Sequence, residues 1–501
     1  MAEEIELKLA LAEEHQARFL RHPLLKQALR RHAESLDNIY YDTEDLSLRR
    51  RGIGLRLRRK GQLWLQTVKL AGASAAGLSS RPEWEAPYSG HFDFSAIEQP
   101  EVRDWLQRPK LLARIVPICE TRFRRVTWEF AASPGAVLLT LDRGWIIASG
   151  RREAISEVEL ELAGAPVHSI FALATQLAQR VTMTPAVLSK AERGYRLHTG
   201  TVPMPFKAAT VALSPDMPPC EAFRRIALSC LEHLQQNHHG ALTSDDPEYI
   251  HQMRVATRRL RAALRLFAPV LPDGLADALH LPFVALMTKL GDARDLDVLL
   301  TEIANPVLTA LPNEPRLPAL ASDITNRRYS ARAEALALLA APDYGRMLVA
   351  ALESLHPEPA AACDETPLQD FATERLRRLR KKLRRLAAAA RLDEPATLHA
   401  LRIAIKRLRY ALEFFAPLAP DRAFVPALQR LAALQDTLGQ LNDLANAGAL
   451  LMECAGDDPR LREAVTLIGG WHGPRYAALL ESITPELGRL TRLRLPPLAA
   501  A

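Results

Sequence analysis

An internal repeat constrains the fold of this chain more than any other feature of its sequence. The segment 247–269, PEYIHQMRVATRRLRAALRLFAP, aligns with the segment 395–417, PATLHALRIAIKRLRYALEFFAP, at a constant offset of 148 positions. The same offset continues downstream, where Asp295 corresponds to Asp443. The period is too long for the modules of a solenoid, so the repeat indicates a duplicated half-domain.

Each copy of the repeat predicts a helix with one basic face. An acid followed by proline begins each helix, at Asp246-Pro247 and at Glu394-Pro395. The basic residues then recur at helical spacing and are nearly unopposed by acids, so pairing along the helix does not explain them. Two such faces brought together would form a basic groove or pore. The residues expected to bind a polyanion there are His251, Arg254, Arg258, Arg259, Arg261, Arg265, His399, Arg402, Lys406, Arg407 and Arg409.

The sequence pattern changes near residue 210. Before that point, runs of period two such as AVLLTLD (136–142) alternate with helical spacing, which predicts a mixed α+β region. From about residue 220 the strand signal disappears, and long Leu/Ala/Arg segments follow with a period of about 3.6 residues. We therefore expect an α+β domain over 1–200, a proline-rich linker over 201–219 and an all-α domain over 220–495.

The composition narrows the choice of partner. The 501 residues suit two or three domains, and 65 basic against 58 acidic residues give a net charge of +7. The basic residues are mostly arginine, whose planar guanidinium suits a polyanion. The predicted basic helix face carries almost no aromatic residues for base stacking, so we expect a phosphate polymer and no nucleic acid.

Other patterns exclude further classes. The five cysteines include no CxxC pair, which argues against a zinc cluster. No stretch reaches roughly 18 uncharged apolar residues, and the acidic N-terminus lacks an apolar signal region. We therefore expect a cytoplasmic protein without a membrane span.

Charged residues of both signs alternate along the predicted strands before residue 200. Glu4, Glu6 and Lys8 share one strand face, and the run SEVELEL (156–162) places three glutamates on another. Like charges about 7 Å apart on one face repel unless a cation lies between them. If the sheet closes, carboxylates that suit Mg²⁺ or Mn²⁺ and arginines that suit phosphate would share a lumen. This combination indicates metal-assisted phosphoryl chemistry, and the chain has no G-x-x-x-x-G-K-[ST] loop of a P-loop NTPase.

Two ordered sets of motifs resemble known families. The first set consists of ExExK (4–8), YYDT (40–43), LRLR (55–58), TVK (67–69), SEVELE (156–161) and LSKAERGY (188–195). In this order, the set resembles the CYTH superfamily, the triphosphate tunnel metalloenzymes. The duplicated HxxRxxxRRLR pattern, followed by LGxxRDxD (290–297) and LGxLND (438–443), resembles the conserved histidine α-helical domain, CHAD. Together they resemble the bacterial inorganic triphosphatases.

The resemblance implies an α+β fold class, with an N-terminal antiparallel eight-stranded β tunnel with flanking helices and a C-terminal all-α pseudo-symmetric helical bundle. It implies Mg²⁺- or Mn²⁺-dependent hydrolysis of inorganic triphosphate to pyrophosphate and phosphate. It also implies that the helical domain binds long-chain polyphosphate, with polyphosphate granules as a candidate location. The alternatives are a polyphosphate-binding protein with a weakly active tunnel, or a nucleotide-directed activity, either adenylate cyclase or thiamine triphosphatase.

The resemblance also assigns roles in the tunnel. For Asp142 it leaves two options open, orienting a metal-bound water or pairing with a tunnel arginine, and Glu83 and Glu85 are further lumen acids. In the run 121–128, strand alternation favours Arg125 as the phosphate ligand. The implied catalytic residues are Glu4, Glu6, Lys8 and Asp142. The implied metal ligands are Glu4, Glu6, Glu157, Glu159 and Glu161. The implied phosphate ligands are Lys8, Arg56, Arg58, Lys69, Arg125 and Lys190.

Overall fold

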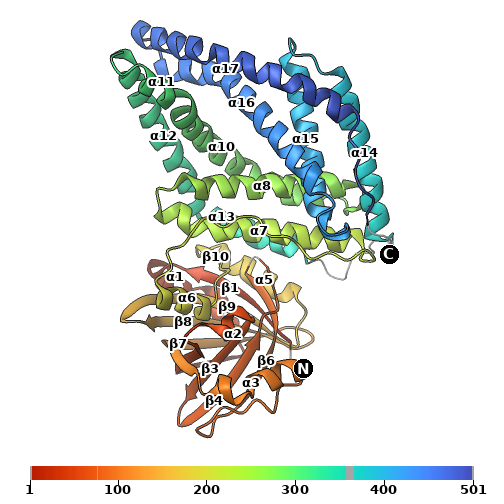
Figure 1. Cartoon of the computed structure of the whole chain (residues 1–501). Coiled ribbons are helices and arrows are strands. Elements are labelled where there is room, and N and C mark those ends of the chain that lie inside the picture. Colours follow the sequence, from red (N-terminus) through yellow and green to blue (C-terminus); the bar gives the residue numbers. More distant parts are fainter. Residues whose placement is uncertain (1–2, 76, 357–365, 499–501) are drawn as a thin grey trace. The chain divides into compact units, whose positions relative to one another are not determined.

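The computed structural model describes residues 3–75, 77–356 and 366–498, without the side chains of residues 3–4, 73–75 and 81. The chain divides into two compact units (Figure 1). The first unit contains the chain up to Met204 together with helix α13 (Pro342–Ser354). The second unit contains the other described helices from Pro205 onward.

The first unit is built on a ten-stranded sheet whose strands pair antiparallel. Strand β1 (Glu3–Leu11) pairs with β9 (Arg151–Ala163) and also with β6 (Leu78–Pro87), so eight of the described strands close into a ring. The predicted eight-stranded tunnel is thereby confirmed. The other strands of the ring are β2 (Arg30–Thr43), β3 (Ile53–Lys60), β4 (Leu63–Leu70), β7 (Ile115–Ala131) and β8 (Ala136–Ala148). The remaining two strands are β5 (Ala73–Ala75), beside β6, and β10 (Met183–Pro185), beside β1.

The apolar faces of these strands pack under helices outside the ring. Beside β3 and β4, buried Leu55 and Val68 join Phe94 and Leu106 in one apolar cluster. Since successive strand side chains point to opposite faces, the charged residues of the same strands face the lumen. The flanking helices are α1 (Gln16–Leu20), α2 (Ser47–Arg50), α3 (Pro100–Leu106), α4 (Pro109–Leu112), α5 (His168–Ala178) and α6 (Lys190–Thr199).

Helix α13 belongs to the first unit although it lies inside the range 220–495 of the predicted helical domain. It packs on α5 and β10. Gly345 allows this close approach, because a Cβ atom at that position would lie 1.8 Å from the carbonyl oxygen of Met183. Thr175 Oγ1 also donates a hydrogen bond of 3.4 Å to Glu353 Oε2. A segment from the second half of the chain therefore completes the tunnel unit.

The second unit contains helices and no strand among its described residues, and its two halves follow the repeat. Helices α8 (Pro247–Phe267) and α15 (Pro395–Phe415) have the same length and are each followed by a short 3-10 turn. Phe267 and Phe415 meet in the core with ring centroids 5.8 Å apart. The predicted pseudo-symmetric bundle is confirmed. The other helices are α7 (Pro219–Thr243), α9 (Leu275–His280), α10 (Val284–Val298), α11 (Asn305–Ala310), α12 (Arg316–Ala340), α14 (Leu368–Ala389), α16 (Val425–Ala455) and α17 (Pro459–Thr491).

Among the described residues, no single helix is long and apolar enough to cross a membrane. Helices α12 and α13, which are bent relative to each other, reach the required length and composition only as a pair.

Candidate active site and basic helical cavity

The ring of strands encloses a cavity of about 450 Å³ that is lined by charges of both signs. Its acids lie on β1, β6, β9 and helix α6, while Arg56, Arg58 and Lys69 lie on β3 and β4. Of the residues predicted for the tunnel, those that line the cavity are Glu6, Lys8, Arg56, Arg58, Lys69, Glu83, Arg125, Glu159, Glu161 and Lys190.

The basic wall is held in place by neighbouring side chains. Glu83 pairs with both Arg56 Nη2, at 3.3 Å, and Lys69 Nζ, at 2.7 Å. Arg58 Nε donates a hydrogen bond of 3.0 Å to Asn38 Oδ1. Burial, together with the nearby Arg56 charge, lowers the pKa of Arg58 to about 10. Because cations crowd together here, a bound phosphate anion would relieve their mutual repulsion.

The acidic wall is formed by β1 and β9. The strand register places Glu6 opposite Glu161 and Lys8 opposite Glu159. Lys8 Nζ lies 3.8 Å from Glu6 Oε1 and 3.6 Å from Glu159 Oε1. Burial disfavours the charge on Lys8, but these carboxylates outweigh it and raise the pKa of the ammonium. Glu4 is on the same strand face by alternation, although its side chain lies outside the described residues.

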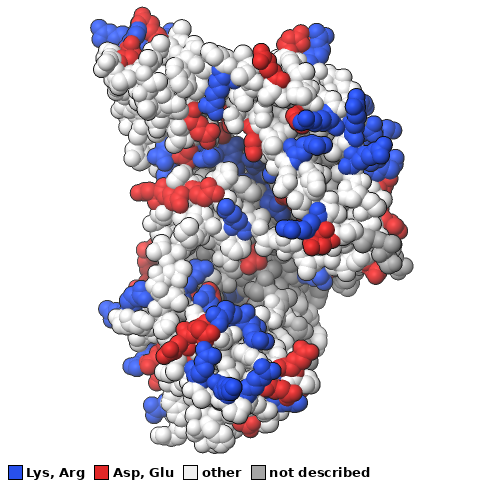
Figure 2. Space-filling view, viewed as in Figure 1, with Lys and Arg blue, Asp and Glu red and all other residues white. Residues whose placement is uncertain are grey.

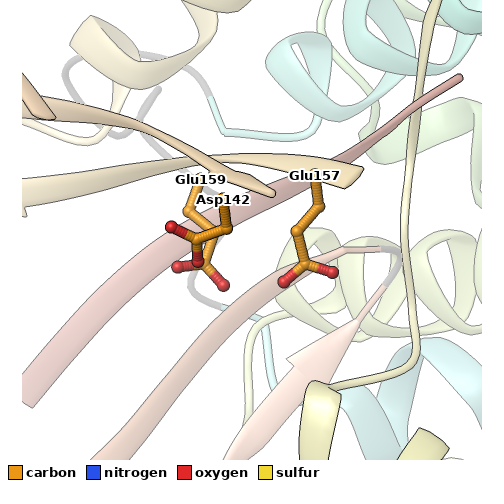
Figure 3. Close-up of side chains that lie close together, drawn as sticks. All are labelled: Asp142, Glu157 and Glu159. Atoms are coloured by element: carbon orange, nitrogen blue, oxygen red, sulfur yellow. The ribbon is translucent and has the colours of Figure 1, made fainter. Parts of the chain in front are cut away.

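Three carboxylates converge at the cavity wall and behind it, with oxygens within 4.8 Å of one another (Figure 3). They belong to Asp142, Glu157 and Glu159. Lys190 Nζ contacts all three, at 2.7 Å from Asp142, at 3.0 Å from Glu159 and in an ion pair with Glu157. Arg125 donates to both oxygens of Asp142, at 2.7 and 2.6 Å, and to Glu159. Asp142 therefore pairs with a tunnel arginine, which is one of the two options left open by the sequence.

The carboxylates of the buried cluster and those of the cavity wall differ in how available they are as metal ligands. In the buried cluster, the protein's own ammonium and guanidinium groups already contact the carboxylates. Asp142 and Glu157 do not line the cavity, whereas Glu6, Glu159 and Glu161 do. Carboxylate oxygens are the ligands that Mg²⁺ and Mn²⁺ prefer. Glu159 belongs to the buried cluster as well as to the cavity wall, so Glu6 and Glu161 are the described cavity glutamates that best fit a divalent ion.

Several cavity residues were missed from the sequence. Arg49 and Glu192 line the cavity and form an ion pair of 2.6 Å. Tyr40, Phe123 and Tyr195 also line it. Tyr40 and Tyr195 stand inside two of the recognised motifs, YYDT and LSKAERGY, so position within a motif was the available signal. Arg49 sits in a run of three arginines that carries no such signal.

The helical unit has a basic cavity of about 630 Å³ between its two halves. Figure 2 shows a hollow in this unit with Lys and Arg side chains in its depth. The predicted residues that line the cavity are His251, Arg254, Arg258, Arg261, His399, Arg402 and Lys406. A second hollow shares some of these residues and adds Arg265 and Arg407.

The downstream motif of the first copy positions one cavity arginine, Arg254. Arg254 Nη1 donates hydrogen bonds to the Gly291 carbonyl oxygen, at 2.7 Å, and to Asp295 Oδ1, at 2.9 Å. Gly291 and Asp295 belong to LGxxRDxD (290–297). The buried Nε atom of Arg402 finds no hydrogen-bond partner among the described residues. Burial, then the charges of nearby arginines, lowers the pKa of Lys406 to about 7.

Two of the predicted polyanion ligands lie elsewhere. Arg259 and Arg409 do not line either hollow, and both contact Glu413, at 2.5 and 3.6 Å. Arg294 and Arg375 line the hollows but were not predicted as ligands. Arg375 belongs to a basic run whose sequence is typical of a solvated helix face. Its place in the lining of the hollow results from helix packing, which the sequence pattern does not show.

The fold and site define a protein that joins an antiparallel strand tunnel, lined by carboxylates and cations, to a duplicated helical bundle with a basic cavity. Residues 2–195 match the family model of the CYTH domain, and residues 225–452 match that of the CHAD domain. The chain belongs to the proteins that combine a CYTH domain with a CHAD domain.

The chain is also similar to individual known proteins. The chain is 31% identical over 198 residues to an inorganic triphosphatase of Haemophilus influenzae. That match covers 39% of this chain and 55% of the relative, so the chain spans about half the length of the curated relative. The crystal structure of the CHAD domain from the plant Ricinus communis is 36% identical, with a TM-score of 0.51, and covers 59% of this chain and 99% of that one. PptA from Streptomyces chartreusis is 16% identical, with a TM-score of 0.42, and covers 55% and 100%.

Proposed function

We propose that the tunnel hydrolyses inorganic triphosphate to pyrophosphate and phosphate with the help of Mg²⁺ or Mn²⁺. The observation that carries the proposal is the single cavity of about 450 Å³, whose acidic and basic walls both face the same lumen. A linear triphosphate needs cations along its length, and its hydrolysis by a metal needs carboxylates beside them. The inorganic triphosphatase activity named for the Haemophilus relative supports this choice of substrate.

The basic and the acidic residues of the cavity have different roles in this proposal. Arg56, Arg58 and Lys69 bind the phosphate oxygens and align the chain in the lumen. Glu6 and Glu161 would hold the divalent ion, which supplies further neutralisation of the phosphate oxygens when bound. The oxygen of water forms a bond to the terminal phosphorus while the bond to the bridging oxygen breaks, and pyrophosphate leaves.

The test compares Glu6→Gln with Glu120→Gln, which changes an exposed acid paired with Arg122 outside the cavity. Phosphate release from tripolyphosphate is measured with Mg²⁺ and with EDTA. We expect hydrolysis that requires the metal, a drop in kcat/KM of about 100-fold in Glu6→Gln and little change in Glu120→Gln. Turnover that Glu6→Gln leaves intact would contradict the proposal. Faster turnover of ATP or thiamine triphosphate, assayed in parallel, would favour the nucleotide-directed alternatives.

We also propose that the helical unit binds long-chain inorganic polyphosphate. The supporting observation is the cavity to which both copies of the repeat contribute cations, including Arg254 and Arg258 from α8 and Arg402 from α15. Such binding releases counterions, so the affinity should fall steeply with salt. Through tethering, it would also raise the phosphate concentration near the enzyme's substrate site.

A matched pair of triple variants tests this binding. Arg254→Ala/Arg258→Ala/Arg402→Ala removes cavity cations, and Lys381→Ala/Lys382→Ala/Arg385→Ala removes three exposed cations of α14. Affinity for polyphosphate is measured in the full chain over a range of salt concentrations. We expect a loss of at least tenfold and a shallower salt slope in the first triple variant only. Equal losses in both would mean that net charge, not the cavity, attracts the polymer.

A further inference from the structure

The tunnel unit also contains a basic hollow of about 460 Å³, which is distinct from the two hollows of the helical unit. It shares no lining residue with the cavity inside the ring. Five cations line it, and no acid does. They come from two separate segments, the end of α2 with the residue that follows it and the region around α4. The cations are Arg50, Arg51, Arg108, Lys110 and Arg114.

Three of the four arginines in this group make side-chain contacts with neighbouring residues. Asp45 contacts Arg50 Nη2, at 2.5 Å, and Arg114 Nη2, at 2.7 Å, and so brings these two arginines together across the two segments. The guanidinium of Arg51 lies over the ring of Trp105, 4.5 Å from its centroid. Guanidinium groups that are held by neighbouring residues lose less conformational freedom on binding phosphate oxygens than mobile side chains do.

The charge of the hollow is poorly balanced. Asp45 is the single acid that contacts any of the five cations within the described residues, and it is shared by two of them. Arg108 and Lys110 are exposed and have no ion-pair partner in the described part of the chain. An anion with several charges along its length would therefore gain favourable interactions with most of the group.

The lining also indicates which polyanion fits. Trp105 is the one aromatic residue among the lining residues, and Arg51 already covers a face of its ring. A nucleic acid would need exposed rings on which successive bases stack, whereas a chain of phosphates needs only cations. The observations therefore favour an inorganic phosphate chain over a nucleic acid.

The hollow is next to the tunnel along the chain. Arg49 and Gly52 line the tunnel cavity, while Arg50 and Arg51 between them line the hollow. Residues 49–52 therefore contribute lining residues to both the tunnel cavity and the hollow. We infer that this hollow is a second binding site, for an inorganic oligophosphate, next to the tunnel and separate from it. The inference rests on the hollow's own charge and holds whether or not the tunnel hydrolyses its substrate.

The experiment uses Trp105 as a reporter in the full chain. The six tryptophans are replaced by 5-fluorotryptophan, the Trp105 resonance is assigned with Trp105→Phe, and inorganic polyphosphate is added without divalent metal. Trp145 is an internal control, because it is exposed and has Arg152 over its ring at 4.6 Å, outside the hollow. We expect the Trp105 resonance to shift saturably and the Trp145 resonance to stay in place.

Two double variants complete the test. Arg108→Ala/Lys110→Ala removes two cations of the hollow and leaves Arg51, which lies over the Trp105 ring, while Arg18→Ala/Lys26→Ala removes one exposed arginine and one exposed lysine elsewhere in the unit. We expect half-saturation of the Trp105 shift at a concentration at least tenfold higher in the first variant and within twofold of the parent in the second. The absence of a Trp105 shift, equal effects of the two variants, or tighter binding of single-stranded DNA at Trp105 would each overturn the inference.

Discussion

The ammonium nitrogen of Lys190 lies 2.7 Å from Asp142 Oδ2, inside a cluster in which the protein's own cations neutralise buried carboxylates. Attraction to Asp142, Glu157 and Glu159 outweighs the effect of burial and raises the pKa of Lys190, so the ammonium stays charged. The cluster is therefore a structural element of the tunnel as much as a part of its chemistry.

Replacing this ammonium should destabilise the tunnel unit. Lys190→Met would remove the closest cation of Glu157 and one of the two cations that contact Asp142, and breaking such a buried pair costs about 3–5 kcal/mol. Urea unfolding monitored by tryptophan fluorescence measures the change. Lys26→Met, at an exposed position, is the control and should change the unfolding free energy by less than about 0.5 kcal/mol. Similar midpoints for both variants would show that the cluster is not maintained by Lys190.

Neighbouring arginines on β3 should differ sharply in their effect on hydrolysis. Arg58 lines the tunnel cavity, whereas Arg59 is exposed on the opposite strand face and donates to the Gly61 carbonyl oxygen. If phosphate binds in the cavity, Arg58→Ala should lower kcat/KM for tripolyphosphate by about 100-fold, and Arg59→Ala by less than about threefold. Steady-state phosphate release measures both. A comparable loss in Arg59→Ala would place the substrate outside the lumen.

Polyphosphate binding by the helical unit should weaken as the pH rises above 7. Burial, followed by the charges of Arg258, Arg402 and Arg254 and partly offset by Asp443, sets the pKa of Lys406 at about 7. A bound polyanion would raise this pKa, so binding above pH 7 must take up a proton. From pH 6 to pH 8 the affinity should fall about tenfold by linkage. Titration calorimetry in buffers of different ionisation enthalpy would detect both the proton uptake and the change in affinity.

Lys406→Arg is the control for this pH dependence, because arginine stays charged throughout the range. His251 and His399 also line the cavity, and burial followed by the Arg294 charge lowers the pKa of His251. His251 therefore contributes mainly below neutral pH. If Lys406→Arg retains the whole fall between pH 7 and pH 8, a group other than Lys406 is responsible.

Local sequence patterns predicted much of the fold and the charged faces of the site. The repeat predicted the matching lengths of α8 and α15, because similar sequences that each begin at an acid followed by proline form helices of similar length. Strand alternation placed Arg125 in the lumen, since side chains of period two share a face. Both properties depend on residues close together in the chain, which is why they could be derived from the sequence alone.

The features of the fold and site that the sequence did not predict depend on contacts between residues distant in the chain. Alternation does not reveal that Lys190, from a helix, occupies the centre of the group formed by Asp142 and Glu157 on two strands. Nor does the repeat reveal that Arg259 turns away from the cavity toward Glu413, because that contact joins helices more than 150 residues apart. The α13 helix was likewise unpredictable, since its packing on α5 involves surfaces distant in sequence.

The contact between Arg259 and Glu413 should be measurable as a coupling energy. Their charged atoms lie 2.5 Å apart, and both side chains are largely buried. Glu413 corresponds to Arg265 in the first copy of the repeat. Glu413→Arg would place a third cation beside Arg259 and Arg409, which should lower the unfolding free energy by about 2–4 kcal/mol. The double variant Arg259→Glu/Glu413→Arg should recover at least about 1 kcal/mol of that loss. Additive effects in denaturant unfolding would show that the pair is not coupled.

Two glycines in helices should respond in opposite ways to alanine. At Gly345 in α13, a Cβ atom would lie 1.8 Å from the Met183 carbonyl oxygen on β10, so alanine must push the helix away from the sheet. At Gly448 in α16, nothing lies within 4 Å of the added atom. Gly345→Ala should therefore destabilise the tunnel unit by about 3 kcal/mol, and Gly448→Ala should stabilise the helical unit by about 0.5–1 kcal/mol. Differential scanning calorimetry of the full chain resolves both changes. An unchanged or raised melting temperature in Gly345→Ala would mean that α13 does not pack on the tunnel unit in solution.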